Sequence, residues 1–365
     1  MALKCGIVGL PNVGKSTLFN CLSNAKAQSA NFPFCTIEPN VGVITVPDER
    51  LNKLSDLVHP EKVQPTTIDI VDIAGLVKGA SKGEGLGNKF LGNIRECDAI
   101  IHVLRCFEND NIVHVDGSVD PIRDKETIDY ELILKDLEAV DKKLEKVTKA
   151  AKTGDKKAVV EKDNLLKYKN HLEQGKPARS IEMDKEDRMV VADLFLLTDK
   201  PVLYVCNVDE TSIASDNEYV EQVKKMAAEE DAEVLKVAAA LESEIVELED
   251  PDERQMFLED AGLKEPGVNQ LIKAAYRLLN LQTYFTAGVK EVRAWTIKKG
   301  MTAPQAAGVI HSDFERGFIK AEVIKLSDFI SFGSEQAVKE AGKMSMEGKE
   351  YVVQDGDVMH FKFNV

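Results

Sequence analysis

Nine residues near the N-terminus combine glycine, lysine and hydroxyl side chains in a spacing that can hold a polyphosphate. Residues 9–17 read GLPNVGKST, which matches the pattern G-x-x-x-x-G-K-[ST]. The apolar run Leu3–Val8 precedes them and predicts a buried strand, and the residues that follow predict an amphipathic helix. In a strand–loop–helix unit of this kind, the backbone N–H groups of the loop point at phosphate oxygens.

Three side chains of this loop have distinct expected roles. We expect Lys15 to reach the β- and γ-phosphates and Ser16 to bind Mg²⁺. The amide of Asn12 is a candidate ligand for a monovalent cation such as K⁺, which would take the place of an arginine finger beside the phosphates.

Two further segments predict a sensor for the γ-phosphate. Residues 72–75 read DIAG and end an apolar run, which fits the pattern D-x-x-G. We expect Asp72 to hold Mg²⁺ through water, and the N–H of Gly75 to contact the γ-phosphate. Thr36 precedes the second predicted strand and is the natural second protein ligand of Mg²⁺, although it also fits an ordinary loop threonine.

The residue after Gly75 is a leucine, so the chain lacks the glutamine that orients water in many GTPases. In Ras-like GTPases a glutamine at this position orients the attacking water, and a leucine such as Leu76 cannot. The polar loop after the fourth strand contains His114, one of six histidines in the chain. We hypothesise that His114 moves toward the nucleotide and orients or activates water; the alternative interpretation is a surface histidine.

The segment expected to read the base favours adenine. Residues 207–210 read NVDE where a GTPase would have N-K-x-D, so Val208 replaces the lysine and Glu210 replaces the aspartate that binds guanine. A site that leaves buried polar groups of a ligand unpaired discriminates strongly against that ligand. The amide of Asn207 and the backbone of Ala239 or Ala240 can line an adenine, and we predict ATP over GTP.

The apolar runs predict an α/β fold that can position these residues. Near-continuous apolar segments are typical of parallel strands that are buried on both faces. Alternation with helical patterns predicts a doubly wound, mostly parallel sheet of a P-loop NTPase, with the ligand at the carboxyl ends of the strands. The expected strands are Leu3–Val8, Val41–Val46, Thr67–Ile73, Ala99–Leu104, Val202–Asn207 and Glu233–Ala238.

Residues 126–178 predict a coiled-coil helical hairpin inserted between strands. Apolar residues from Ile133 to Val147 are spaced alternately by four and three, Gly154 offers a turn, and a second helix follows from Lys156 to Glu173. The tip, Lys142–Lys157, has seven lysines and a net charge of +5. It is either a solvated surface or a contact with a phosphate backbone, most plausibly of RNA.

The segment from Leu281 predicts a compact β-sheet module of neutral charge. Expected strands are Glu291–Ile297, Phe318–Val323, Tyr351–Val353 and Val358–Phe363, with a helix at Thr302–Ile310 that Thr302 caps. Residues 282–365 have a net charge of zero in a chain whose net charge is −15.

Bulk composition narrows the class of protein. A net charge of −15 argues against a surface that binds nucleic acid throughout. The six cysteines form no metal-ligand spacing and are expected to be reduced core thiols, except Cys35, whose loop position exposes it to oxidation. The chain starts directly with a predicted strand and has no apolar run of membrane-spanning length, so we expect a cytoplasmic protein.

The motifs together resemble a known family. Pro11-Asn12 within the phosphate loop, the stretch Asp72–Ala80 with the glycines after it, and the altered base segment Asn207–Glu210 resemble the Obg-like ATPases of the YchF type. The resemblance implies a G domain at residues 1–280 that contains the 126–178 hairpin, and a ubiquitin-like β-grasp (TGS) domain at residues 281–365. It also implies an Mg²⁺-dependent, translation-factor-class ATPase that binds the ribosome or its subunits. The residues it assigns are Asn12, Val13, Gly14, Lys15, Ser16 and Thr17 to the phosphates, Ser16 and Thr36 to the metal, and Val208 to the base.

Three alternatives stay open at this stage. They are a GTPase of the Obg class, an RNA- or ribosome-binding scaffold with a structural nucleotide, and a P-loop kinase of small molecules, for which no arginine-rich lid is seen. We expect a monomer whose contact with ribosomal RNA uses the hairpin tip and the TGS domain.

Overall fold

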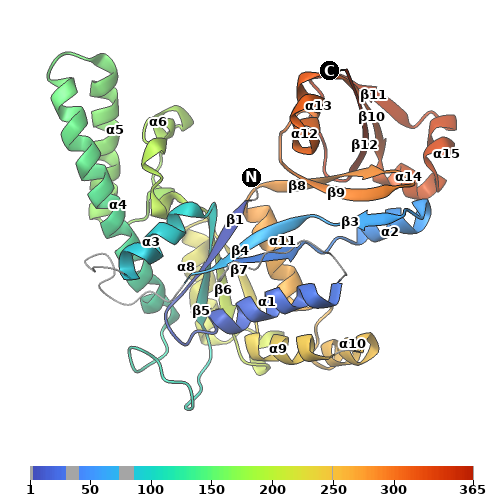
Figure 1. The fold of residues 1–365 in the computed structure, drawn as a ribbon. Coiled ribbons are helices and arrows are strands. Elements are labelled where there is room, and N and C mark those ends of the chain that lie inside the picture. Colours follow the sequence, from blue (N-terminus) through green and yellow to red (C-terminus); the bar gives the residue numbers. More distant parts are fainter. Residues whose placement is uncertain (1–2, 30–40, 74–85, 249, 365) are drawn as a thin grey trace. The chain divides into compact units, whose positions relative to one another are not determined.

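The computed structural model describes residues 3–29, 41–73, 86–248 and 250–364. The chain divides into two compact units (Figure 1). The first comprises Met1–Gly42 and Asp69–Leu271, and the second comprises Val43–Ile68 and Ile272–Val365. Within the described ranges, no helix has both the length and the apolar character needed to cross a bilayer.

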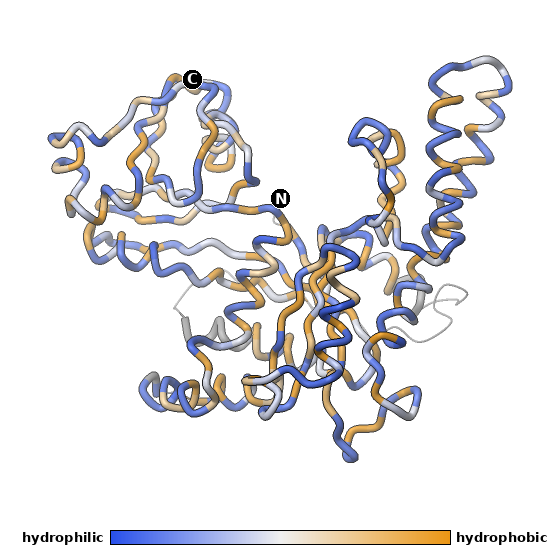
Figure 2. Tube along the Cα trace, turned by 180° about the vertical axis from the view of Figure 1, so that it is seen from behind, coloured by the Kyte–Doolittle hydropathy of each residue, from blue (hydrophilic) through white to orange (hydrophobic). Residues whose placement is uncertain are grey.

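The predicted α/β sheet is confirmed. Its strand order is β2-β4-β1-β5-β6-β7, and the five neighbours from β4 to β7 pair in parallel. Strands β5 and β6 are buried along their whole length, as expected for largely apolar strands at the centre of a parallel sheet, and the strands in the middle of the first unit are mostly apolar in Figure 2. The strands are β1 (Lys4–Val8), β2 (Val41–Thr45), β4 (Thr67–Asp72), β5 (Ala99–Arg105), β6 (Val202–Asn207) and β7 (Glu233–Val237).

The order of the strands places a ligand site at the end of β1. Strand β4 lies on one side of β1 and β5 on the other. The strand order therefore reverses direction at β1. Ligands of open α/β sheets bind at such a switch point, beyond the carboxyl ends of the strands. Outside the helical hairpin and the short turns that follow it, the helices of this unit are α1 (Lys15–Ser29), α3 (Leu86–Glu96), α7 (Thr211–Ala214), α8 (Glu218–Glu229), α9 (Ala239–Glu247), α10 (Pro251–Asp260) and the first residues of α11 (Gly267–Leu278).

The predicted helical hairpin is also confirmed. Helices α4 (Pro121–Ala151) and α5 (Lys156–Glu173) pack side by side through a shared apolar core that includes Val140 and Leu165. Helix α4 begins before the predicted hairpin boundary because Asp120 accepts hydrogen bonds from two N–H groups of its first turn. Short helical turns follow at α6 (Lys185–Met189), Ala178–Ser180, Ala192–Leu194 and Leu197–Asp199.

The second unit contains a sheet of order β11-β10-β12-β8-β9-β3. The predicted cap at Thr302 is present as a capping box with Gln305. The expected strand Tyr351–Val353 is wrong, because only Val352 forms an isolated bridge, with Thr302. The elements are β8 (Leu281–Ala287), β9 (Glu291–Lys298), β10 (Phe318–Lys325), β11 (Met344–Glu347), β12 (Asp357–Phe363), α12 (Ala303–Ile310), α13 (Ser312–Arg316), α14 (Leu326–Phe332) and α15 (Glu335–Glu340).

A segment from the N-terminal third of the chain completes this second unit. Strand β3 (Lys62–Gln64) pairs in parallel with β9, and helix α2 (Glu49–Val58) buries Leu51 and Leu54 in the same apolar cluster as Phe285. Arg50 of α2 donates a hydrogen bond of 2.7 Å to Asp355. The β-sheet module is therefore discontinuous in sequence, which its local patterns did not reveal.

Candidate nucleotide-binding site

The phosphate loop joins β1 to α1 with a left-handed backbone at two positions. Gly14 has φ +97°, which a side chain rarely adopts, and Asn12 has φ +63°. Lys15 starts α1, is buried, and donates a hydrogen bond of 2.6 Å from Nζ to the Leu10 carbonyl. Burial lowers the pKa of Lys15 to about 8, against the opposing charge of Asp72.

Asp72 lies at the end of β4 close to the phosphate loop. Burial raises the pKa of this carboxyl, and the Lys15 charge and the Ser16 hydroxyl oppose that rise. Its buried Oδ1 atom has no hydrogen-bond donor among the residues that the structure describes. A carboxylate oxygen without a donor beside a serine hydroxyl is the hard oxygen set that Mg²⁺ prefers, so these residues fit the metal.

Two of the predicted site residues lie outside the described residues. They are Thr36, expected to bind Mg²⁺, and Gly75, expected to contact the γ-phosphate; Leu76, which replaces the water-orienting glutamine, also lies outside them. Cys35, expected to be open to oxidation, also lies outside them. The five cysteines of the described part are buried and unbridged.

Asn207 joins three parts of the nucleotide site. It ends β6, and its Nδ2 donates a hydrogen bond of 2.9 Å to the Val13 carbonyl in the phosphate loop. Its Oδ1 accepts a hydrogen bond of 3.0 Å from the N–H of Ala239, at the start of α9. The structure therefore brings Asn207, Val13 and Ala239 together, but both ends of the Asn207 amide are used by protein groups. Val208 is buried, whereas Ala240 is exposed.

The two acidic residues of the base segment, Asp209 and Glu210, have different environments. Oδ1 of Asp209 accepts hydrogen bonds from the Thr211 hydroxyl at 2.8 Å and the Ser212 N–H at 2.9 Å. Although burial opposes ionisation, these hydrogen bonds lower the pKa of Asp209. The carboxylate thus stabilises the first turn of α7, while Glu210 is exposed.

His114 is buried, although its polar loop had suggested a residue near the surface. Its Nε2 lies 2.8 Å from Oδ2 of Asp124, and its Nδ1 accepts a hydrogen bond of 3.2 Å from the Asp116 N–H. Because Nδ1 accepts a hydrogen bond, Nε2 carries the ring proton, and Nε2–H donates a hydrogen bond to Asp124. The sequence prediction missed Asp124, whose only signal was an acidic side chain in the first turn of a long helix.

The same cluster has the composition of a metal site but already contains a cation. Ligand atoms of His114, Asp116 and Asp124 lie within 4.8 Å of one another. The Arg123 guanidinium lies 3.1 Å from Asp124 and 3.8 Å from Asp116. We therefore interpret the cluster as an ion-paired hydrogen-bond network that fixes His114.

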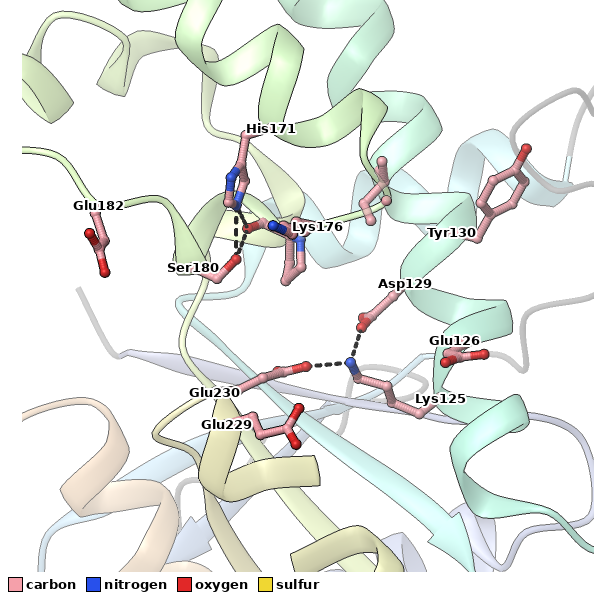
Figure 3. Close-up of a pocket in the computed structure, with 13 residues that line it drawn as sticks. Lys125, Glu126, Asp129, Tyr130, His171, Lys176, Ser180, Glu182, Glu229 and Glu230 are labelled. Atoms are coloured by element: carbon pink, nitrogen blue, oxygen red, sulfur yellow. Dashed lines mark hydrogen bonds and ion pairs between the residues drawn. The ribbon is translucent and has the colours of Figure 1, made fainter. Parts of the chain in front are cut away.

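A separate cavity of about 780 Å³ lies between the base of the hairpin and the end of α8 (Figure 3). Lys125 forms ion pairs with Asp129, at 2.9 Å, and with Glu230. Glu230 also forms an ion pair with Arg179, whose Nη2 lies 3.0 Å from Oε2 of Glu230. These buried charges compensate one another within the protein, so we assign no ligand to the cavity.

The hairpin tip has free and paired lysines. Lys142, Lys143 and Lys149 form ion pairs with acidic residues of the same hairpin or its neighbours. Four lysines of the tip are exposed and have no ion pair among the described residues: Lys146, Lys152, Lys156 and Lys157. The positive charge of the tip is thus concentrated toward its end.

These features define a P-loop nucleoside-triphosphate hydrolase of the α/β class, with an inserted helical hairpin and a second unit built on a mixed sheet. A family model described as a 50S ribosome-binding GTPase matches residues 4–136. The model of the YchF-GTPase C-terminal domain, described as a protein of unknown function, matches residues 281–364.

Full-length relatives identify the family. The chain is 60% identical to the "Ribosome-binding ATPase YchF" of Bacillus subtilis and 57% identical to that of Escherichia coli O157:H7, over 100% of each chain. The solved structure of the Schizosaccharomyces pombe YchF GTPase matches with a TM-score of 0.89 and 39% identity, over 99% of this chain and 97% of that one. The chain belongs to the YchF family, which confirms the family and the enzyme class predicted from the motifs.

Proposed function

We propose that the chain hydrolyses ATP to ADP and phosphate in preference to GTP, and that its nucleotide state controls binding to the ribosome or one of its subunits. The names of its bacterial relatives include both ribosome binding and ATPase activity. The relative from Schizosaccharomyces pombe is named a GTPase, so the choice of nucleotide is the point that needs a test.

The preference for ATP is argued from the hydrogen bonds that Asp209 already accepts within the protein. A guanine reader needs a carboxylate that accepts hydrogen bonds from N1–H and N2–H₂ of the base. Oδ1 of Asp209 already accepts from Thr211 and Ser212. Glu210, which stands in place of the guanine-binding aspartate, is longer by one methylene and would not offer guanine the same pair of acceptors. A guanine would therefore pair poorly at N1–H and N2–H₂, whereas an adenine has no donor at N1.

The phosphate loop supplies the remaining groups for hydrolysis. Residues Asn12–Thr17 would surround the phosphates, and Ser16 with Asp72 would hold Mg²⁺, as would Thr36. Bound Mg²⁺ neutralises charge on the β- and γ-phosphate oxygens. Lys15 donates to the Leu10 carbonyl, and its ammonium group would instead pair with the triphosphate when ATP is bound. The N–H of Gly75 would complete the γ-phosphate contact.

His114 is our candidate for the residue that orients water. Its Nε2–H bond to Asp124 leaves Nδ1 as the acceptor nitrogen, and to act as a general base Nδ1 would have to exchange its hydrogen bond from the Asp116 N–H for one from water. For that role the ring, or the loop that carries it, must turn toward the γ-phosphate. His114→Ala should lower kcat by a factor of about 10²–10⁴ and leave ATP affinity nearly unchanged. Turnover at the wild-type rate would exclude this role.

A role for K⁺ depends on the free end of the Asn12 amide. Nδ2 of Asn12 donates to the Val113 carbonyl at 3.1 Å, which leaves Oδ1 to coordinate a monovalent cation. Faster hydrolysis in K⁺ than in Na⁺, lost in Asn12→Ala, is the expected result. Equal rates in the two salts would contradict it.

Side-by-side measurements with ATP and GTP test the main proposal. We expect tighter binding and faster hydrolysis of ATP, and no hydrolysis in Lys15→Ala. Asp209→Asn keeps the shape of the side chain and the oxygen that accepts from Thr211 and Ser212, so it is the control for the role of Asp209 at the start of α7. Tighter binding of GTP would refute the ATP preference and favour a GTPase of the Obg class. ATP hydrolysis that persists in Lys15→Ala would assign the activity to a contaminant and favour the scaffold alternative.

The exposed lysines at the hairpin tip are the proposed contact with ribosomal RNA, together with the second unit. Co-sedimentation with ribosomes should weaken when Lys152, Lys156 and Lys157 are changed to glutamate, and it should differ between ATP and ADP. Lys225→Glu on α8 reverses one exposed charge away from the tip and is the control for Lys156→Glu alone. Binding that ignores both the tip charges and the nucleotide would contradict the proposal. We also propose that the chain acts as a monomer.

A further inference from the structure

Arg105 is a buried cation that the proposed chemistry does not use. It is the last residue of β5, has an exposed fraction of 1%, and lies in register with Asn207 of β6. Its guanidinium donates three hydrogen bonds to carbonyls of the loop that follows: Phe107 at 3.1 Å, Asn109 at 3.1 Å and Ile112 at 2.9 Å. Its Cζ atom also lies 4.9 Å from the centre of the Phe107 ring.

The loop held by Arg105 leads directly to one contact with the phosphate loop and one with helix α4. After Ile112, the carbonyl of Val113 accepts a hydrogen bond from Asn12 in the phosphate loop, and His114 binds Asp124 on α4. Three consecutive residues are thus fixed to a strand end, to the phosphate loop and to the first turn of the hairpin.

Polar contacts rather than apolar packing determine the path of this loop. The side chains of Val113 and Val115 are 75% and 55% exposed, so they contribute little burial. The guanidinium is the group that reaches carbonyls at both ends of the loop, because its planar fork presents donors in fixed directions. A lysine has a single ammonium centre and cannot reach all three carbonyls.

We infer that Arg105 is a positioning residue for ATP hydrolysis: it sets the backbone path that places the Val113 carbonyl at Asn12 and holds His114 at Asp124, the position from which its ring would turn toward the phosphates. This inference rests on the proposed role of His114. Arg105 does not contact the nucleotide in this scheme, so its loss should affect turnover rather than binding. A displacement of about 1 Å at a catalytic group can cost about 100-fold in rate.

Kinetics of Arg105→Lys and Arg105→Gln test the inference, with Arg188→Gln as a matched control. Arg188 also donates to two backbone carbonyls, those of Arg179 and Ile181, but belongs to α6 near the hairpin. We expect kcat for ATP to fall roughly 10- to 100-fold in both Arg105 variants. The KM for ATP should stay within about twofold, and Arg188→Gln should keep wild-type kcat. Circular dichroism and binding of a non-hydrolysable ATP analogue establish that each variant is folded.

A double-variant cycle with His114→Ala separates this inference from the proposal on which it rests. If Arg105 acts through His114, the double variant loses no more activity than His114→Ala alone. Losses that multiply, or an Arg105→Lys variant with wild-type kcat, would overturn the inference while His114 keeps its role. Wild-type turnover in His114→Ala would defeat the role of His114 and the inference together.

Discussion

His102 gives the first unit a specific sensitivity to acid. It lies in β5, has an exposed fraction of 2%, and its ring centre is 5.7 Å from that of Tyr204. Its Nε2 has no hydrogen-bond partner among the described residues. Burial lowers the pKa of His102 to about 4; Asp129 and Glu230 oppose this effect, and Lys125 and Arg179 add to it.

The sign of the effect follows from the two states. The folded chain binds the His102 proton more weakly than the unfolded chain, whose ordinary pKa is 6.5. Stability is therefore fully present above pH 6.5 and is lost as the pH falls toward 4. With about 1.4 kcal/mol per pKa unit, the loss is about 2 kcal/mol at pH 5 and about 3 kcal/mol at pH 4. Such a loss is a large part of the stability of a typical domain.

The perturbation is His102→Leu, which removes the titrating group and keeps an apolar side chain in the core. Denaturant unfolding followed by circular dichroism from pH 7.5 to pH 4.5 should show a smaller loss of stability in the variant. A remaining loss is expected from Glu230, whose pKa is lowered by Arg179 and Lys125 in spite of its burial. His360→Leu changes an exposed histidine of β12 and should keep the wild-type slope.

Nuclear magnetic resonance provides the direct check. The ring signals of His102 should not titrate above about pH 5 in the folded protein. A titration near pH 6.5, or identical pH slopes for wild type and His102→Leu, would refute the reasoning.

Three other predictions follow from buried groups of the first unit. Burial lowers the pKa of Lys15 to about 8, and a triphosphate prefers the protonated form, so affinity for a non-hydrolysable ATP analogue should fall as the pH rises from 7 to 9.5; calorimetry that shows constant affinity would contradict this. Asn207→Ala leaves the Val13 carbonyl and the Ala239 N–H without partners, at a cost of about 1–3 kcal/mol for each group, and should weaken ATP binding at least tenfold in the same assay. Asp136 is fully buried and accepts hydrogen bonds from both Leu197 and Thr198, so Asp136→Ala should lower the free energy of unfolding by about 3 kcal/mol, whereas the exposed control Asp163→Ala should change it by less than about 0.5 kcal/mol.

Local patterns were sufficient for the parts of the fold that depend on near neighbours. Strand β5 is a continuous apolar run and α4 has a regular seam, so both could be predicted without knowledge of the rest of the chain. The phosphate loop is a contiguous motif that its flanking strand and helix position. In each case the interactions that decide the structure join residues close in sequence.

The remaining features depend on residues far apart in sequence. Strand β3 has only three residues, and it is a strand because it pairs with β9. No pattern within those three residues predicts this pairing. The loop around His114 reads as polar and exposed, but Asp124 brings the ring into the interior. Arg105 ends a largely apolar strand, and the charged side chain at that position was the signal in the sequence for its role.

The membership of α2 and β3 in the second unit has a consequence for how the chain folds during its synthesis. Val63 pairs with Val292, so the earlier strand is complete long before its partner exists. At roughly 5–20 residues per second, the interval is on the order of 10–50 s. Through that time Leu51 and Leu54 lack the apolar cluster that finally buries them, so this stretch of the nascent protein is open to non-native apolar contacts until the C-terminal strands are made.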